Sequence, residues 1–416
     1  MSDVEQHLEE LRGEGLYRRM RMVSGPQGPR VLLDGRPVLL LCSNNYLGLA
    51  DHPRVREAAA DAAMRWGVGA GASRLVSGNM TVHRRLEERL AEFKGAPCCV
   101  LFGSGYLANA GIVSALAGRG DVVFSDELNH ASIVDGCRLS RAEAFVYRHG
   151  DMEHLAWGLR EAEGRGSLIV TDGVFSMDGD VAPLAEIVEL ARRHDARVMV
   201  DEAHATGTTG PGGRGTVAEA GLEAEVDVLV GTLGKALGAY GAFACCDQTV
   251  ARYLVNTART LIFSTALPPP VAAAAMAALE LLATEPRLVE RLQRNAGALR
   301  DALAGEGILT GRSRTHILPV VIGGAAQTVQ ASRTALADGV FAQAIRPPTV
   351  PDGTSRIRLA VMASHRRSEL RAAATTLAEA VRAAGGARLP EEEPSLERAG
   401  GVFDRDTSDG DLAEAA

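Results

Sequence analysis

The chain has 416 residues, 46% of them hydrophobic and 23% charged, and its 44 basic and 52 acidic side chains give a formal net charge of -8. This composition is that of a globular protein with two or three domains, and an acidic chain without basic blocks is not expected to bind nucleic acid. The six cysteines lack Cys-x-x-Cys spacing, so we expect reduced thiols and neither a disulfide framework nor a metal site.

The N-terminal segment is polar, and its first 15 residues lack the basic and apolar regions of a signal peptide. The apolar stretches 31–34 and 37–41 flank Asp34-Gly35, which predicts a small hairpin. No stretch approaches the roughly 18 consecutive apolar residues of a membrane helix. We therefore expect a cytoplasmic protein in which residues 1–45 form an N-terminal arm.

Short apolar runs then alternate with longer stretches that have the periodicity of amphipathic helices. Such alternation predicts βαβ units and a largely parallel sheet. The expected fold class is α/β, with a large domain over residues 46–275 built on this sheet. The runs that we predict as strands are residues 98–102, 121–124, 167–171, 197–200 and 228–230.

A polar cluster follows each of these strands. The carboxyl ends of the strands in an open α/β sheet line the ligand crevice, so we expect the five clusters to converge on one site. The clusters are Gly103-Ser104-Gly105-Tyr106, Ser125-Asp126-Glu127-Leu128-Asn129-His130, Asp172-Gly173-Val174-Phe175-Ser176, Asp201-Glu202-Ala203-His204 and Thr232-Leu233-Gly234-Lys235.

The C-terminal third predicts a smaller α/β domain over residues 276–388. An alanine-rich helix is expected from the prolines at 268–270 to about Thr284, followed by strands at 317–321 and 357–361 and a closing helix at 367–384. Residues 389–416 form an acidic tail, which we expect to be disordered.

Residues 103–108 fit the Gly-x-Gly-x-x-Gly/Ala dinucleotide fingerprint, with Asp126 about twenty residues later as the ribose acid. A nicotinamide-dependent oxidoreductase is therefore one alternative, although this fingerprint normally lies on the first strand of its domain and leaves the other clusters unexplained. Glycines at a helix N-terminus also let backbone amides approach any anionic phosphate, and a tight turn without a ligand is equally compatible with the pattern.

Asp201 and Lys235 each have an ordinary and a chemical interpretation. A strand-end aspartate can cap the next helix, but a buried carboxylate can also keep a ring nitrogen protonated, and His204 lies close enough to reach the same ligand. A lone lysine is usually solvated, whereas a lysine desolvated in a glycine-flanked loop has a lowered pKa and can form a Schiff base.

Four further residues have weaker signals. His130 can be a structural hydrogen-bonding residue or a flat ring stacked on a flat cofactor, and Ser176 can be a turn residue or a phosphate donor. The guanidinium groups of Arg356 and Arg358 suit carboxylates, and we expect one of them to point inward and the other to solvent.

A strand-end aspartate, a histidine three residues later and a glycine-flanked lysine about thirty residues on are the parts of a pyridoxal-phosphate site. From about Leu16 to Ala384 the chain resembles the α-oxoamine synthases, PLP-dependent transferases of fold type I, which have the aspartate-aminotransferase-like fold. The motifs that carry this resemblance are Ser43-Asn44-Asn45-Tyr46-Leu47-Gly48-Leu49, Gly71-Ala72-Ser73-Arg74, Leu128-Asn129-His130-Ala131-Ser132, Phe175-Ser176-Met177-Asp178-Gly179-Asp180, Asp201-Glu202-Ala203-His204 and Thr232-Leu233-Gly234-Lys235.

The resemblance implies a role for each matching residue. Lys235 would form the Schiff base with pyridoxal 5'-phosphate, Asp201 would pair with the pyridine nitrogen, and His204 would bond the phenolic oxygen. His130 would stack on the ring. The cofactor, chiefly its phosphate end, would be held by Gly105, Tyr106, Ser176 and Thr232. The amino acid carboxylate would be bound by Asn44 and Arg358, and the acyl substrate by Arg18 and Thr349.

Asp180 and residues 345–351 look like the branch of the family that condenses L-alanine with a pimeloyl thioester, with loss of CO2 and a free thiol, in biotin synthesis. The thioester can be carried by coenzyme A or by an acyl carrier protein, and the resemblance implies a homodimer. A sister enzyme that uses glycine, of the 2-amino-3-ketobutyrate CoA ligase type, is the nearest alternative. The nicotinamide-dependent oxidoreductase and a non-catalytic scaffold are more distant ones.

Overall fold

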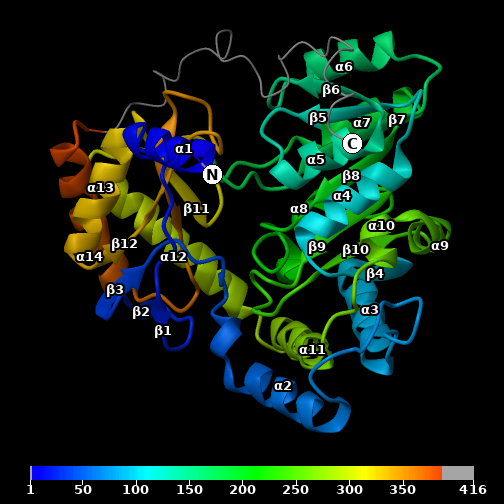
Figure 1. Ribbon diagram of the computed structural model, residues 1–416, viewed down its shortest axis with the longest axis horizontal. Helices are drawn as coiled ribbons and strands as arrows, with labels where there is room; N and C mark the ends of the chain where they lie inside the picture. Colours follow the sequence, from blue (N-terminus) through cyan, green and yellow to red (C-terminus); the bar gives the residue numbers. More distant parts are fainter. Residues whose placement is uncertain (1, 387–416) are drawn as a thin grey trace.

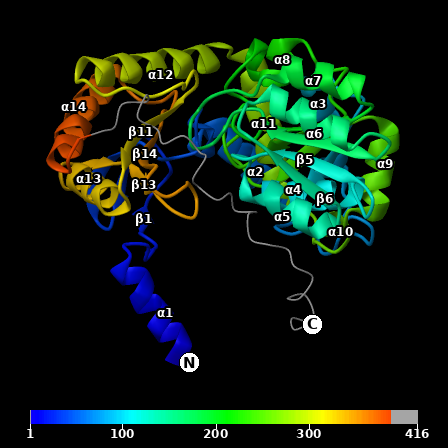
Figure 2. The same cartoon turned by 90° about the horizontal axis from the view of Figure 1, so that it is seen from above.

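The computed structural model describes residues 2–386, so the predicted acidic tail at 389–416 lies outside the described residues. The polar helix α1 (Ser2–Gly13) projects away from the rest of the chain (Figure 2). A hairpin follows, formed by β2 (Arg30–Leu33) and β3 (Arg36–Leu40), with β1 (Val23–Ser24) antiparallel to β2. Asp34 and Gly35 have φ values of 50° and 81°, as a tight two-residue turn requires, and the predicted hairpin is confirmed.

A seven-stranded sheet forms the centre of the larger part of the chain, in the order β4-β10-β9-β8-β7-β5-β6. All five apolar runs predicted as strands belong to it, and β5 to β9 pair in parallel, which confirms the expected α/β class. The strands are β4 (Cys98–Phe102), β5 (Val122–Asp126), β6 (Glu143–Tyr147), β7 (Ser167–Asp172), β8 (Arg197–Asp201), β9 (Val228–Thr232) and β10 (Ala242–Cys246).

Two strands of this sheet were not predicted, for different reasons. β6 is an edge strand whose first two side chains are exposed, so its apolar signal is weak. β10 follows β9 after a glycine-rich loop instead of a helix and runs antiparallel to both β4 and β9. The alternation of strand and helix therefore gives no sign of it.

Helices cover both faces of the central sheet, which is why its strands are apolar on both sides (Figure 1). No helix within residues 2–386 combines the length and apolar character needed to cross a membrane. One face packs against α4 (Gly105–Leu116), α5 (Ala131–Ser140), α9 (Gln248–Thr257) and α10 (Arg259–Ile262). The other packs against α3 (Thr81–Lys94), α6 (Met152–Glu161), α7 (Leu184–Arg193), α8 (Thr216–Ala220) and the alanine-rich α11 (Pro269–Thr284), on which α2 (Pro53–Trp66) lies. Short 3-10 turns are η1 (Leu49–Asp51) and η2 (Pro211–Gly213).

A smaller antiparallel sheet, β11-β14-β13, lies in the C-terminal part, and α12 (Arg287–Gly305) runs between the two sheet-containing bodies (Figure 1). Its strands are β11 (Ile317–Gly323), β13 (Gln343–Ile345) and β14 (Ser355–Ala360), and its helices are α13 (Ala325–Ala337) and α14 (Arg367–Ala383). The predicted strands at 317–321 and 357–361 and both predicted helices are confirmed. β12 (Val340–Phe341) pairs in parallel with β3, which joins the two ends of the chain in one sheet. The division at residues 45, 275 and 388 stays a prediction.

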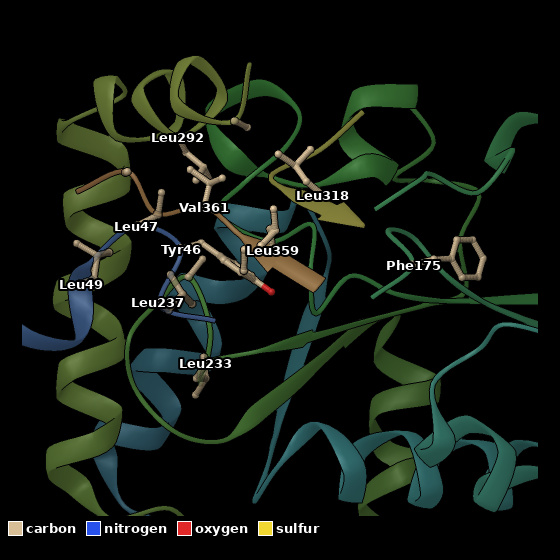
Figure 3. Packing of buried hydrophobic residues seen from close by; sticks show 14 of the residues in the cluster. Tyr46, Leu47, Leu49, Phe175, Leu233, Leu237, Leu292, Leu318, Leu359 and Val361 are labelled. Atoms are coloured by element: carbon tan, nitrogen blue, oxygen red, sulfur yellow. The ribbon is translucent and has the colours of Figure 1, made fainter. Parts of the chain in front are cut away.

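The main hydrophobic cluster crosses from the larger body into the smaller one. Figure 3 shows Tyr46, Leu237 and Leu359, which come from widely separated segments of the chain, within this cluster. Because all three are essentially buried, the two bodies share a continuous apolar core on this side of the crevice.

A buried ion pair fastens α3 to the loop after β8. Lys94 Nζ lies 2.6 Å from Glu202 Oε2, with the two side chains 1% and 0% exposed, and also donates to the Arg214 carbonyl. The second carboxylate oxygen, Glu202 Oε1, accepts hydrogen bonds from the Thr216 hydroxyl and the Val217 amide. Every polar atom of the Glu202 side chain is therefore satisfied by residues that lie far apart in the sequence.

We predict that Glu202→Ala lowers the free energy of unfolding of the cofactor-free protein by about 3–5 kcal/mol, because it leaves the Lys94 charge buried without a carboxylate to pair with. The matched control is Glu88→Ala, which breaks the exposed pair with Arg84 and should cost less than about 1 kcal/mol. Urea denaturation measures both variants. Equal losses in the two would contradict the prediction.

Candidate active site

The polar loops at the carboxyl ends of the central strands meet as expected. Asn129, after β5, donates to the carbonyl of Val170 on β7 and accepts from the amide of Asp172. Asn109, on the helix after β4, donates to Asp201 Oδ2 at the end of β8 over 2.6 Å. Side chains from a loop and from helix α4 therefore link separate strands at this edge of the sheet.

Lys235 lies against His204 in a chain of hydrogen bonds. Lys235 Nζ is 2.9 Å from His204 Nε2, and His204 Nδ1 is 2.7 Å from the Tyr46 hydroxyl, which donates to Asn44 Oδ1. If the Tyr46 proton goes to Asn44, the hydroxyl accepts from His204 Nδ1–H, and Nε2 is left to accept from Lys235. The geometry therefore fits a neutral His204.

Burial governs the electrostatics of this chain. It lowers the pKa of His204 well below its ordinary value, and the positive charges of Lys235 and Arg358 lower it further. Burial also lowers the pKa of Lys235 to about 8, against the opposing effect of the Asp201 and Asp172 carboxylates. About one-tenth of the Lys235 amine is thus uncharged at pH 7, far more than for a solvated lysine, and the uncharged form is the one that a nucleophile or general base requires.

Asp201 is 6% exposed and accepts from two donors, the Ala203 amide at 2.7 Å and the Asn109 side chain. Asn109 also donates to the Ser132 hydroxyl, which lies 2.8 Å from His130 Nδ1. The Ser132 amide donates to the same ring nitrogen. This network makes Nδ1 of His130 an acceptor and leaves the proton on Nε2, while burial lowers the pKa of the ring.

Arg358, on strand β14 of the small sheet, also contacts the residues around Lys235. Its Nε donates to the carbonyl of Ser176, and its two terminal nitrogens lie 3.4 Å from Asn44 Oδ1 and 3.2 Å from the Tyr46 hydroxyl. The expectation that one of Arg356 and Arg358 faces solvent is wrong, since they are 5% and 7% exposed. Residues two apart in a strand lie on the same face, and here both guanidinium groups find partners on the loop after β7.

The residues predicted to bind phosphate differ in their burial and in their hydrogen-bond partners. α4 begins at Gly105, and the Ser104 hydroxyl caps it by accepting from the Leu107 amide, so the amides of Gly105 and Tyr106 lie at the positive end of the helix. The Tyr106 side chain is exposed and donates to Asp135. The Thr232 hydroxyl donates to the Gly241 carbonyl and accepts from the Gly234 amide, and Ser176 is buried.

Arg18 and Thr349 are not brought into the cluster around Lys235. Both are exposed. They share the neighbourhood of Arg346, whose guanidinium donates to the carbonyls of Gly15 and Tyr17 and whose carbonyl accepts from the Thr349 amide. Burial lowers the pKa of Arg346, and the nearby charge of Arg18 lowers it further. The N-terminal segment and the 345–351 segment thus form a separate polar group of residues.

Asp126, which the dinucleotide alternative requires as a ribose acid, is already engaged. Its carboxylate accepts from the amides of Leu128 and Gly150 and lies 2.9 Å from His149 Nδ1. Only 2% of its side chain is exposed. A buried, fully bonded carboxylate cannot take up ribose hydroxyls, which argues against nicotinamide binding at this turn.

Comparison with known proteins assigns the chain to a family. The model of the aminotransferase class I and II family matches residues 36–377. The 8-amino-7-oxononanoate synthase of Citrifermentans bemidjiense is 53% identical over 377 residues, which cover 90% of this chain and 97% of the relative. The chain belongs to the 8-amino-7-oxononanoate synthase family.

Two solved structures extend this likeness to the fold. The serine palmitoyltransferase from S. paucimobilis with a bound PLP–myriocin aldimine superposes with a TM-score of 0.87 at 33% identity, covering 92% of this chain and 98% of that one. The 8-amino-7-oxononanoate synthase from Francisella tularensis gives a TM-score of 0.72 at 25% identity, covering 83% and 98%. The architecture is that of the PLP-dependent enzymes of fold type I, as the sequence predicts.

Several residues of the site in this 8-amino-7-oxononanoate synthase family member were not singled out from the sequence. Asn109 lies one helical turn after Gly105, on the face that looks toward Asp201, and that spacing could have indicated it. The His316 ring contacts Tyr46 edge-on with ring centres 4.0 Å apart. Burial lowers the pKa of His316 to about 3. His316 comes from the small sheet region, and no pattern in the sequence connects it to the crevice. Asn109 and His316 were missed altogether, whereas Tyr46, Ser132 and Asp172 lie in the motifs and clusters quoted from the sequence but were given no role.

We predict that Lys235→Met stabilises the cofactor-free protein by about 1–2 kcal/mol at pH 7, since a buried amine whose pKa is lowered must give up its proton or remain charged at a cost. Between pH 8 and 10.5 the unfolded chain binds the proton that the folded protein lacks, so the stability of the wild type rises with pH. The advantage of the variant should therefore shrink over this window. Urea denaturation at pH 7 and pH 10 measures it, and a pH-independent difference would be inconsistent with this origin.

Proposed function

We propose that this protein condenses L-alanine with a pimeloyl thioester to give 8-amino-7-oxononanoate, CO2 and a free thiol, with pyridoxal 5'-phosphate as its cofactor. The observation that carries the proposal is the contact between Lys235 and a neutral His204, beside the Asp201 carboxylate and Arg358. Membership of the 8-amino-7-oxononanoate synthase family supports the choice of substrates.

The residues present fit the cofactor. Asp201 is a buried carboxylate held by two donors, suited to a protonated ring nitrogen, and His204 and Lys235 lie on one hydrogen-bonded chain beside it. The α4 N-terminus at Gly105 and Tyr106 suits a phosphate, to which the hydroxyls of Ser176 and Thr232 can add. The ring of His130 is available for stacking. When bound, the cofactor supplies an electron-accepting ring that stabilises negative charge on the α-carbon of an amino acid.

Individual side chains bind the substrate, transfer the proton and stabilise the developing charge. Arg358 and Asn44 bind the carboxylate of L-alanine, and Lys235, with its pKa near 8, takes the α-proton and later returns one. In the condensation, the α-carbon of alanine bonds to the thioester carbonyl carbon, the thiol leaves, and the carboxyl group departs as CO2. His130 donates from Nε2 to the thioester oxygen as negative charge develops, a contribution of about 3 kcal/mol.

The acyl end of the substrate is assigned to Arg18 and Thr349, which lie near Arg346 in the N-terminal and 345–351 segments. The positive charges of Arg18 and Arg346 suit the free carboxylate of a pimeloyl chain or the phosphates of its carrier, coenzyme A or a carrier protein. We also infer a cytoplasmic homodimer. The family resemblance supports the homodimer, and the six free thiols support a reducing compartment.

The cofactor can be tested cleanly because Lys94 and Lys235 are the two lysines of the whole sequence. The wild type with pyridoxal phosphate should show a visible absorption band that shifts on adding L-alanine, and borohydride should fix the cofactor on Lys235 alone. Lys94 serves as an internal control because its side chain is 1% exposed. Lys235→Ala should lose the band and at least about 10³-fold in turnover. A colourless protein that binds NAD would overturn the proposal.

The substrate pair is tested by comparing turnover of L-alanine plus pimeloyl thioester with glycine plus acetyl thioester. We expect the alanine reaction to have the larger kcat/KM by at least about 100-fold, because the acyl chain and the methyl group both contribute binding energy. Coenzyme A and carrier-protein donors should be run side by side. Preference for glycine would move the assignment to a sister enzyme of the family.

A further inference from the structure

Residues 173–182 form a small hairpin that lies between the central sheet and the small sheet. Val174 and Val181 form an antiparallel bridge, and Phe175 and Asp180 are joined by a backbone hydrogen bond of 3.1 Å. The segment includes Ser176 and Asp180 of the Phe175–Asp180 motif. We call it the 173–182 hairpin.

Toward the small sheet, the 173–182 hairpin is held at three points. Arg358 donates to the carbonyl of Ser176, Arg356 forms an ion pair with Asp178, and the carbonyl of Gly179 accepts from the Thr315 hydroxyl at 2.9 Å. A Cβ on Gly179 would clash with the Ile317 carbonyl, so the backbones approach too closely there for any other residue. The position of Arg358 therefore depends on where this hairpin lies.

Toward the central sheet, His149 binds the same hairpin. Its Nε2 lies 2.7 Å from Asp180 Oδ2, and its Nδ1 lies 2.9 Å from Asp126 Oδ1 at the end of β5. The ring also packs edge-on against Phe175, with ring centres 4.4 Å apart. His149 thus bridges one carboxylate on the sheet and one on the hairpin.

The bridge is strong because both bonds are charge-assisted. Burial alone lowers the pKa of His149, but the hydrogen bonds to Asp126 and Asp180 raise it to about 10, so the ring carries a proton on each nitrogen at neutral pH. Asp180 Oδ1 is buried and has no hydrogen-bond partner within the described part of the chain. Without His149 the Asp180 carboxylate would therefore have no hydrogen-bond partner among residues 2–386, which favours movement of this end of the hairpin toward water.

We propose that His149 is a positioning residue, which fixes the 173–182 hairpin to the central sheet and so places Arg358 for the carboxylate of the amino acid substrate. This role rests on the proposed function, since Arg358 needs a carboxylate to bind. In this role Asp180 is the residue through which His149 holds the hairpin. Neither His149 nor Asp180 touches the Lys235 cluster through any hydrogen bond in residues 2–386.

The first test is steady-state kinetics of His149→Ala, Asp180→Ala and the double variant. Each single variant should raise the KM for L-alanine by about tenfold or more, as expected for the loss of a charge-assisted hydrogen bond. The KM for the pimeloyl thioester and kcat should change by less than about threefold. The double variant should be no worse than either single one, because all three break the same link.

Conservative replacement separates positioning from a charge effect. Asp180→Asn keeps an oxygen that accepts from His149, so its KM for L-alanine should stay within about threefold of the wild type. His83→Gln is the matched control for loss of a buried histidine, because His83 bonds the Leu267 carbonyl and the Met80 amide and touches none of these residues. An unchanged KM for L-alanine in folded His149→Ala, or additive losses in the double variant, overturns the proposal.

A second readout does not need activity. Hydrogen–deuterium exchange should show the amides of Phe175 and Gly179, which are hydrogen-bonded within the hairpin, exchanging at least about tenfold faster in His149→Ala than in the wild type or in His83→Gln. Unchanged exchange at these amides would refute the positioning role. A wild type that exchanges as expected but does not turn over alanine would instead refute the proposed function alone.

Discussion

The structure depends on one electrostatic constraint: an amine must lie inside a polar crevice without being locked in its charged form. Removal from water disfavours the ammonium form of Lys235, and the carboxylates of Asp201 and Asp172 restore part of that loss, which leaves the pKa at about 8. His204 must then be neutral, because a second cation beside Lys235 would be prohibitive. The other positive charge of the site, Arg358, is held by bonds to Ser176, Asn44 and Tyr46, and it lowers the pKa values of Lys235 and His204 further.

The central residues of this site could be predicted from the sequence. Asp201, His204 and Lys235 directly follow apolar strands, and parallel strands bring such residues to one edge whatever the details of packing. The strands themselves were recognisable because helices cover both faces of the sheet and make the runs apolar throughout. The half-exposed β6 and the antiparallel β10, which has no helix before it, lack that signature.

The remainder of the site arises from contacts that local pattern does not encode. Tyr46 and His316 reach the crevice from outside the central sheet, and their place is set by how the two bodies pack. The error over Arg356 and Arg358 is of another kind, because positions two apart in a strand share a face and strand geometry already argues against opposite directions. What the sequence does not show is the 173–182 hairpin, from another part of the chain, which supplies the partners that allow both guanidinium groups to be buried.

The pairing of β3 with β12 has a consequence for the order of folding. Leu39 is the register partner of Val340, so the edge that β3 offers cannot be covered until almost the whole chain has left the ribosome. The central sheet, complete once β10 has been made, can form long before that moment. During synthesis the β2–β3 hairpin therefore has an unpaired edge, with which a wrong strand can pair.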